Sequence, residues 1–125
     1  MKLLLDSHVL LWMAAAPERL SATTREAVAD AETARLLSAA VVWELTLKES
    51  LGRLTVPAPW ATMVERLVLD VLPVTLPHAA AVGRLPWHHR DPFDRLLVAQ
   101  AQVEQAVLVT ADRALEAYDV ALLRA

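Results

Sequence analysis

Short apolar runs alternate with stretches of helical periodicity along the whole chain, and this alternation constrains the fold more than any other feature. The predicted strands are 3–5, 35–38, 72–75, 106–110 and 120–123. Strands that alternate with helices are typical of βαβ units, which build a parallel sheet covered by helices on both faces. The 56% hydrophobic content, rich in Ala, Leu and Val, agrees with strands that are buried on both faces.

Helix boundaries can be predicted from capping residues and from proline and glycine. Five helices are predicted over residues 7–15, 22–31, 60–69, 77–82 and, briefly, 113–118, the second of them after the N-cap Ser21. Another helix is capped by Ser38, passes Trp43, Leu47 and Lys48, and ends at Gly52. A further helix begins at Asp91-Pro92. Residues 83–90 are expected to form a loop. No repeat, low-complexity tract or linker interrupts the pattern, so residues 1–125 are expected to form a single domain.

Net charge and cysteine usage limit the function classes. The formal net charge is −3 and the pI about 5.7, so no global basic field favours a pure nucleic-acid-binding module. An enzyme whose acidic site is neutralised by a metal stays possible. The absence of cysteine excludes disulfides, thiolate nucleophiles and zinc–cysteine sites.

The first residues imitate a secretory signal, because Met1-Lys2 is followed by apolar residues and then by three alanines. Asp6 and His8 interrupt the apolar segment that such a signal needs. No stretch reaches the roughly 18 uninterrupted apolar residues of a membrane span. We therefore expect a cytoplasmic protein.

Four acidic residues stand where apolar runs give way to helices. They are Asp6, Glu44, Asp94 and Asp112. Sites in open α/β sheets gather at the carboxyl ends of parallel strands, so these side chains are expected to converge. Crowded carboxylates repel each other unless a cation or a proton offsets the charge, and hard divalent ions such as Mg²⁺ bind carboxylate oxygens. The pattern predicts a metal site.

Helix capping is the alternative explanation for most of these acids. Asp6, Asp91 and Asp112 all precede helices, where an aspartate cap contributes about 1 kcal/mol. Asp94 lies at the third helical position, where an acid favours the helix dipole. For Asp91, in the sequence Asp-Pro, capping is the better interpretation.

Glu44 lies inside an apolar segment, past any capping position, and its neighbours are expected to be mostly buried. A buried carboxylate without a partner is costly. Lys48, four residues on, could pair with Glu44 on the same helix face, so a purely structural ion pair remains open.

Other hydrolytic motifs are missing. The chain has no HExxH motif, no Gly-rich phosphate loop and no Gly-x-Ser-x-Gly elbow. His88 and His89 could be metal ligands, but two adjacent residues in a regular element seldom face one ion.

Four segments together resemble the PIN-domain family, specifically its VapC-like toxin ribonucleases. They are residues 1–12, residues 38–44 with Lys48, residues 89–101 and residues 108–112. The resemblance covers the whole chain in order. It implies a three-layer α/β/α sandwich around a central parallel sheet.

The resemblance also implies an acidic site for Mg²⁺ or Mn²⁺. Its residues would be Asp6, Glu44, Asp94 and Asp112, with Asp91, Thr110 and Ser7 as accessory candidates; Ser7 stands where threonine is frequent and keeps a hydroxyl. Asp6 and Asp94 are expected to bind metal directly and Asp112 directly or through water, while Glu44 either ligates or acts as the base.

The implied activity is endoribonuclease, with hydrolysis of RNA phosphodiester bonds by a metal-activated water. The implied partners are RNA, a small cognate antitoxin and a second copy of the chain in a homodimer. Lys48, Arg90 and Arg95 are candidates for contacts to RNA, unless they are only solvated charges.

Two rival functions follow from the same residues. An inactive PIN-like interaction module would use the acids as caps and salt-bridge partners. A haloacid-dehalogenase-like phosphatase would need a second aspartate two residues after Asp6, where His8 stands, and is disfavoured.

Overall fold

Five parallel strands form the centre of the computed structural model, which describes residues 1–125. The strands are β1 (Lys2–Leu5), β2 (Ala34–Ser38), β3 (Asp70–Leu72), β4 (Val107–Thr110) and β5 (Leu122–Arg124). Their spatial order is β3-β2-β1-β4-β5, and every neighbouring pair is parallel. The chain first builds outward from β1 through β2 and β3, and then returns to the other side of β1 for β4 and β5.

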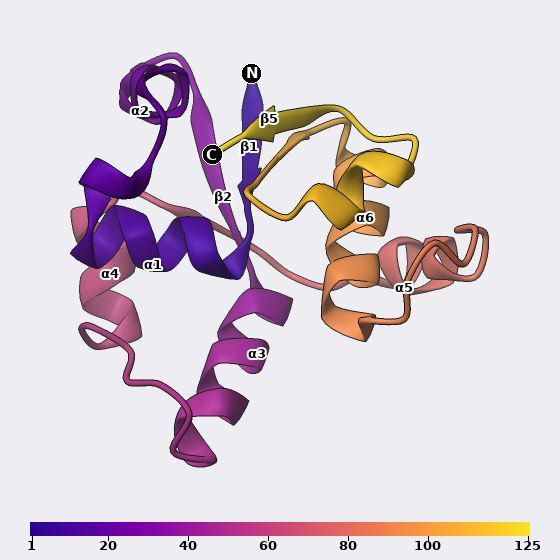
Figure 1. Cartoon of the computed structure of the whole chain (residues 1–125), viewed down its shortest axis with the longest axis horizontal. Coiled ribbons are helices and arrows are strands. Elements are labelled where there is room, and N and C mark those ends of the chain that lie inside the picture. The colour runs from indigo at the N-terminus through magenta and orange to yellow at the C-terminus, as the bar shows by residue number, and fades with distance from the viewer.

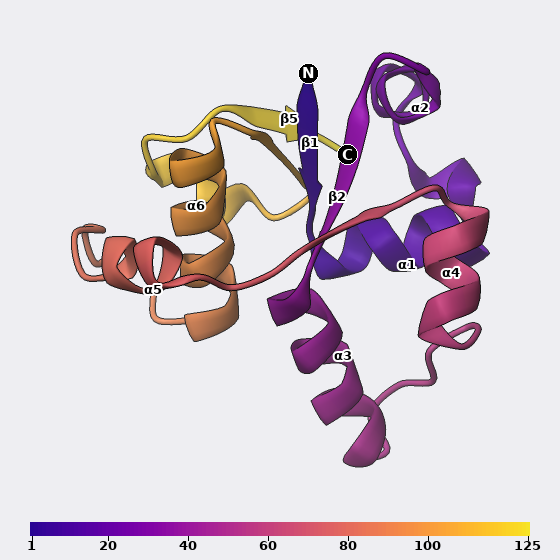
Figure 2. The ribbon, with the colours of Figure 1, turned by 180° about the vertical axis from the view of Figure 1, so that it is seen from behind.

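Helices cover both faces of this sheet. They are α1 (Ser7–Ala15), α2 (Ala22–Ala29), α3 (Ala39–Ser50), α4 (Trp60–Arg66), α5 (Leu76–Val82) and α6 (Pro92–Glu104), with 3₁₀ turns η1 (Pro17–Arg19) and η2 (Arg113–Ala117). α1, α2 and α4 lie on one side of the strands and α5 and α6 on the other, while α3 extends beyond the end of β2 (Figures 1 and 2). The expected three-layer α/β/α sandwich is confirmed.

The central strands lack the alternation of a half-exposed sheet. Leu3, Leu4 and Leu5 of β1 and Leu108 and Val109 of β4 are fully buried, within a core cluster of 22 residues. Each such side chain stabilises the fold by about 1.5–3 kcal/mol when it leaves water. Because both faces of β1 and β4 are covered, polar side chains are accommodated only where these strands end.

Several boundaries differ from the sequence-based expectation. The strand expected at 72–75 is β3 at Asp70–Leu72, because Pro73 has no N–H for the ladder and Asp70 is tolerated on an exposed edge strand. The last strand lies at Leu122–Arg124 instead of 120–123, and the brief helix expected over 113–118 is the 3₁₀ turn η2. α2 and α4 end earlier than expected, at Ala29 and Arg66.

No helix is both long and apolar enough to cross a membrane.

Candidate active site

The two central strands bring Asp6 and Asp112 to one edge of the sheet. β1 pairs with β4 at Leu5 and Val109, and the Asp6 amide donates to the Val109 carbonyl at 3.1 Å. Asp112 follows β4, with its amide held by the Thr110 hydroxyl at 3.0 Å. This is the point where the strand order reverses direction, the place at which ligands bind in open α/β sheets.

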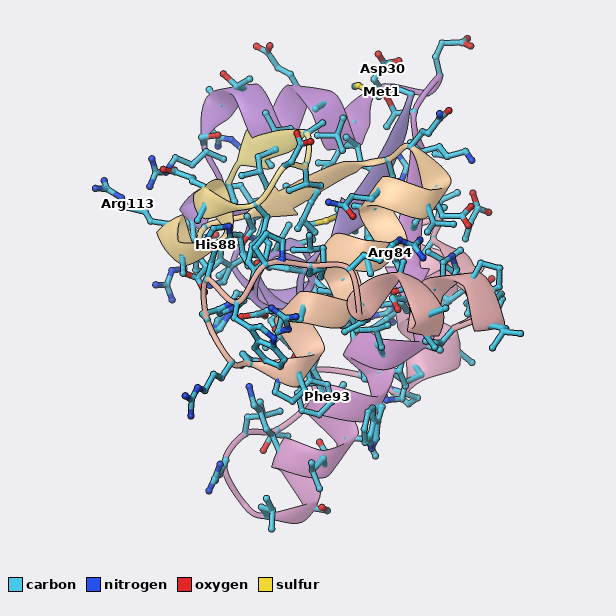
Figure 3. The ribbon with its side chains drawn as sticks, turned by 90° about the vertical axis from the view of Figure 1, so that its right-hand side faces the viewer. Met1, Asp30, Arg84, His88, Phe93 and Arg113 are labelled. Atoms are coloured by element: carbon cyan, nitrogen blue, oxygen red, sulfur yellow. The ribbon has the colours of Figure 1, made fainter.

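Glu44 and Asp94 come from helices that pack against each other at this edge. Glu44 lies in α3 and Asp94 in the first turn of α6. The Trp43 ring meets the Phe93 ring edge-on, with 4.8 Å between centroids, and so fixes the two helices where the acids stand. Figure 3 shows Phe93 at the start of α6, close to α3.

The four predicted acids line a single pocket of about 340 Å³. Its lining residues are Asp6, Ser7, His8, Trp12, Glu44, Lys48, Asp91, Asp94, Ala111 and Asp112. The structure therefore brings together every acid that the sequence placed at the site, including the accessory Asp91. Thr110 lies directly behind it, buried at the end of β4.

Three of these aspartates also cap helices, as the alternative explanation required. Asp6 Oδ1 accepts from the Val9 amide, and Asp112 Oδ1 accepts from the Ala114 amide, both at 2.9 Å. Asp91 Oδ1 accepts from the amides of Phe93 at 2.9 Å and Asp94 at 3.1 Å. Each cap uses Oδ1 alone, and a carboxylate has two acceptor oxygens. Capping and a place in the pocket are therefore compatible.

Glu44 forms the ion pair with Lys48 that the sequence offered as its structural explanation. Its Oε2 lies 2.7 Å from Lys48 Nζ, and the residue is only 4% exposed. The expectation that its neighbours are mostly buried is wrong on one side, because Trp43 is 61% exposed. Lys48 therefore places one cation inside a pocket that is otherwise lined by acids.

Burial and like charges disfavour ionisation of the two central aspartates. Burial, followed by the Asp91 carboxylate, raises the pKa of Asp94 to about 6; Glu44 and Asp112 act in the same direction, and a hydrogen bond from His89 opposes them. Burial also raises the pKa of Asp6, against the lowering effect of hydrogen bonds from Thr110 and Val9. The pocket thus concentrates negative charge that its own cations do not offset.

The donor chemistry fits a hard divalent cation, because the pocket offers several carboxylate oxygens, and a bound cation would offset the desolvation and the like charges that raise the pKa of Asp94. The side-chain positions do not form a ready coordination shell: no three histidine, aspartate or glutamate side chains lie close enough to hold one ion. Glu44 faces Lys48, and Asp94 Oδ2 lies 3.4 Å from His89 Nε2. A metal at this site would have to draw these two acids away from their present partners.

Sequence reasoning missed two residues of the pocket. His8 and Trp12 both line it, with 6.3 Å between their rings, and His8 is exposed. Their spacing of four residues, starting two positions after the capping Asp6, puts both on the helix face that carries the pocket. That spacing was the available signal.

The structure corrects the expectation for Arg95. This residue is 3% exposed, and its guanidinium donates to the carbonyls of Val82, Leu85 and Pro86 and to the Tyr118 hydroxyl. A buried group with all these partners does not reach an RNA backbone. Of the other two cations, Lys48 is committed to Glu44 and Arg90 is exposed beside the pocket.

Comparison with known proteins gives a family and a fold. Residues 3–121 match the model of the PIN domain. The chain is 35% identical over 119 residues to Ribonuclease VapC22 of Mycobacterium tuberculosis, covering 92% of this chain and 90% of that protein.

Solved structures agree on the fold. The chain superposes with a TM-score of 0.76 and 15% identity on VapBC2 of Rickettsia felis bound to a promoter DNA fragment, covering 100% of this chain and 99% of the other. For DNA-bound VapBC of Salmonella typhimurium the TM-score is 0.70 at 16% identity, with 99% and 98% covered.

Proposed function

Because the chain belongs to the PIN domain family, we propose that it is a metal-dependent endoribonuclease and the toxin of a VapBC-type toxin–antitoxin pair. One observation carries the proposal: four acids from separate elements line one pocket at the reversal of strand order, where burial, followed by the neighbouring carboxylates, raises the pKa of Asp94 to about 6. The 35% identity to a ribonuclease over nearly the full length supports RNA as the substrate.

In this proposal Asp6 and Asp94 hold Mg²⁺ or Mn²⁺, and Asp112 completes the site directly or through water. A divalent ion bound there would lower the pKa of a water molecule and stabilise charge on the phosphate under attack. Asp6 is oriented for this by its cap to Val9 and by the Thr110 hydroxyl, while Asp91 holds the start of α6. Ser7, 7% exposed, adds a hydroxyl to the pocket wall.

Glu44 is the candidate base. Its ion pair with Lys48 holds the carboxylate at the pocket wall, where it would accept a proton from the attacking water, or would bind the metal if it turned away from Lys48. No cysteine or serine nucleophile is needed, because phosphoryl transfer depends on positioning and electrostatics.

The protein partners follow from the family and from the surface. The structural neighbours are VapBC assemblies, which supports a small antitoxin as partner. Trp43 and Leu47 of α3 and Leu51 directly after it are exposed and form an apolar surface suited to a protein partner, either the antitoxin or a second copy of the chain. An RNA-cleaving toxin would act in the cytoplasm. Co-purification of the chain with the product of the adjacent gene tests whether that product is its antitoxin.

Cleavage of a structured RNA by the purified chain tests the activity. We expect new RNA ends in Mg²⁺ or Mn²⁺, none in EDTA, and none from the Asp6→Asn and Asp94→Asn variants. Cleavage that persists in both variants would overturn the site.

The inactive interaction module remains the rival, because caps and the Lys48 ion pair already give most of the acids a structural role. It is favoured if calorimetry detects no Mn²⁺ binding and no new RNA ends form with the wild-type chain.

A further inference from the structure

The loop between α5 and α6 forms a second hollow next to the acidic pocket. It encloses about 610 Å³ and is lined by Trp87, His88, His89 and Arg90. The following residue, Asp91, belongs to the wall of the acidic pocket, so consecutive residues of the chain line the two hollows. Figure 3 shows His88 on this loop, at the surface.

Trp87 is exposed but is not loosely held. Its side chain is 76% exposed, while the guanidinium carbon of Arg95 lies 3.8 Å from its ring centroid. One face of the indole therefore rests on a cation, and the opposite face is turned to solvent. Such a cation–π contact is strongest when the cation is desolvated, as Arg95 is.

Arg95 is itself fixed by the loop that it supports. It donates to the carbonyls of Val82, Leu85 and Pro86 at 2.8–3.4 Å, and to the Tyr118 hydroxyl at 3.1 Å. The Trp87 ring thus sits on a support that cannot shift without breaking these bonds.

The same network ties the loop to the acidic pocket. Tyr118 Oη lies 2.6 Å from His89 Nδ1, and His89 Nε2 lies 3.4 Å from Asp94 Oδ2. The His88 ring packs edge-on against Tyr118, at 4.9 Å between centroids. The indole is therefore held in a defined place relative to Asp94.

We propose that Trp87 is a stacking platform for an unpaired base of the RNA substrate, next to the phosphate in the acidic pocket, and that Arg90 binds a neighbouring phosphate. The inference rests on the proposed ribonuclease function and names the part of the substrate that the loop binds. Recognition of RNA by proteins commonly uses unpaired bases stacked on aromatic side chains or on arginine. A pre-positioned ring lowers the ordering cost of binding.

Charge and side-chain chemistry favour RNA over a protein segment here. Residues 83–90 carry Arg84 and Arg90 and no acid, in a chain of net charge −3 whose neighbouring pocket is acidic. The hollow is lined by an indole, two imidazoles and a guanidinium, without an aliphatic side chain. Exposed leucines suited to a protein partner lie elsewhere, such as Leu47 on α3 and Leu51 directly after it.

Binding of a fluorescent single-stranded oligoribonucleotide, measured by anisotropy in the Asp94→Asn background, tests this without turnover. We expect Trp87→Ala to weaken binding about ten-fold, the loss of one stacked base. Trp87→Phe keeps an aromatic face and recovers most of the affinity. Trp87→Leu keeps apolar area without that face and does not. Arg90→Gln also weakens binding and flattens its salt dependence, whereas Arg66→Gln, exposed on α4, serves as the matched control.

Melting curves show that each variant is folded, and Trp87→Leu and Trp87→Phe keep the test valid if Trp87→Ala unfolds. Equal RNA affinity of Trp87→Leu and Trp87→Phe overturns the proposal, as does a Trp87 effect confined to binding of the antitoxin. If the wild-type chain cleaves RNA but Trp87 substitutions leave RNA affinity unchanged, the stacking role of Trp87 is refuted and the ribonuclease function stands. Trp87-dependent RNA binding without cleavage refutes the proposed function alone.

Discussion

Asp94 and Arg95 are neighbours in the first turns of α6, but their charged groups have opposite surroundings. Asp94 faces the acidic pocket, where burial and three other carboxylates raise its pKa and only His89, at 3.4 Å, opposes them. Arg95 faces the loop before α6, where three carbonyls, one hydroxyl and an indole ring surround its guanidinium.

The difference separates a functional charge from a structural one. A buried charge with all its hydrogen bonds made holds the surrounding chain in place. A charge left uncompensated destabilises the metal-free fold and persists at sites where a ligand supplies the missing partner. The acidic pocket and the Arg95 anchor should therefore respond to mutation with opposite signs of stability change.

The largest effect is expected from Arg95→Ala. Removing the guanidinium leaves the carbonyls of Leu85 and Pro86 without their donor and the Trp87 ring without its support. We expect a loss of about 3–5 kcal/mol in the free energy of unfolding, measured by urea denaturation. Arg90→Ala, exposed in the same loop, should stay within about 0.5 kcal/mol of wild type. Equal stability of the two variants would contradict a structural role for Arg95.

Cleavage of RNA should fall by roughly a hundred-fold or more in Asp6→Asn and in Asp94→Asn, because each loses a metal-binding charge. Asparagine remains a good N-cap, so the Asp6 variant keeps α1 capped. Asp70→Asn, exposed on the edge strand β3, is the control and should cleave normally. Rates are measured at saturating Mn²⁺, with circular dichroism to verify the fold.

The affinity for Mn²⁺ should fall as the pH drops through about 6, the raised pKa of Asp94. Metal and proton compete for the same carboxylate, so the apparent affinity declines by up to about ten-fold per pH unit below that value. Calorimetric titration between pH 5 and 8 measures the effect. An affinity that is constant from pH 8 down to pH 5 would mean that Asp94 is not a ligand.

The smallest effect concerns the stability of the metal-free protein. Because the pKa of Asp94 is raised in the folded state from 3.8 to about 6, its contribution to stability is complete below pH 4 and is lost as the pH rises to 6. In EDTA at pH 7, Asp94→Asn should therefore be more stable than wild type, by about 1 kcal/mol once solvent screening of the partly exposed group is allowed for. The gain should vanish near pH 4, and a loss of stability at pH 7 would contradict it.

The order of strands and helices and the members of the acidic pocket could be predicted from local pattern. Buried strands such as Leu3–Leu5 are continuously apolar, and the acids that follow them must lie at strand ends. The position of β3 was predicted wrongly because Asp70 interrupts the apolar pattern on which strand prediction depends. An edge strand tolerates such a residue, and its edge position is set by tertiary pairing.

The orientation of individual side chains could not be predicted. Arg95 was expected to contact RNA because it is a cation beside Asp94, whereas its partners come from the preceding loop and from Tyr118, 23 residues away. The support of Trp87 by Arg95 depends on the path of that loop, which no periodicity encodes. Capping was a correct interpretation of Asp6 and Asp112, and their geometry shows that it is compatible with a place in the pocket.

Thermal unfolding of wild type and Asp94→Asn, each in EDTA and in Mn²⁺, tests most directly whether the uncompensated charge of the acidic pocket serves to bind a metal. A ligand that binds only the folded state raises the melting temperature. We expect Asp94→Asn to melt above wild type in EDTA, and wild type to rise in Mn²⁺ while the variant stays where it was. The same melting temperatures for wild type with and without Mn²⁺ would contradict a metal site in this pocket.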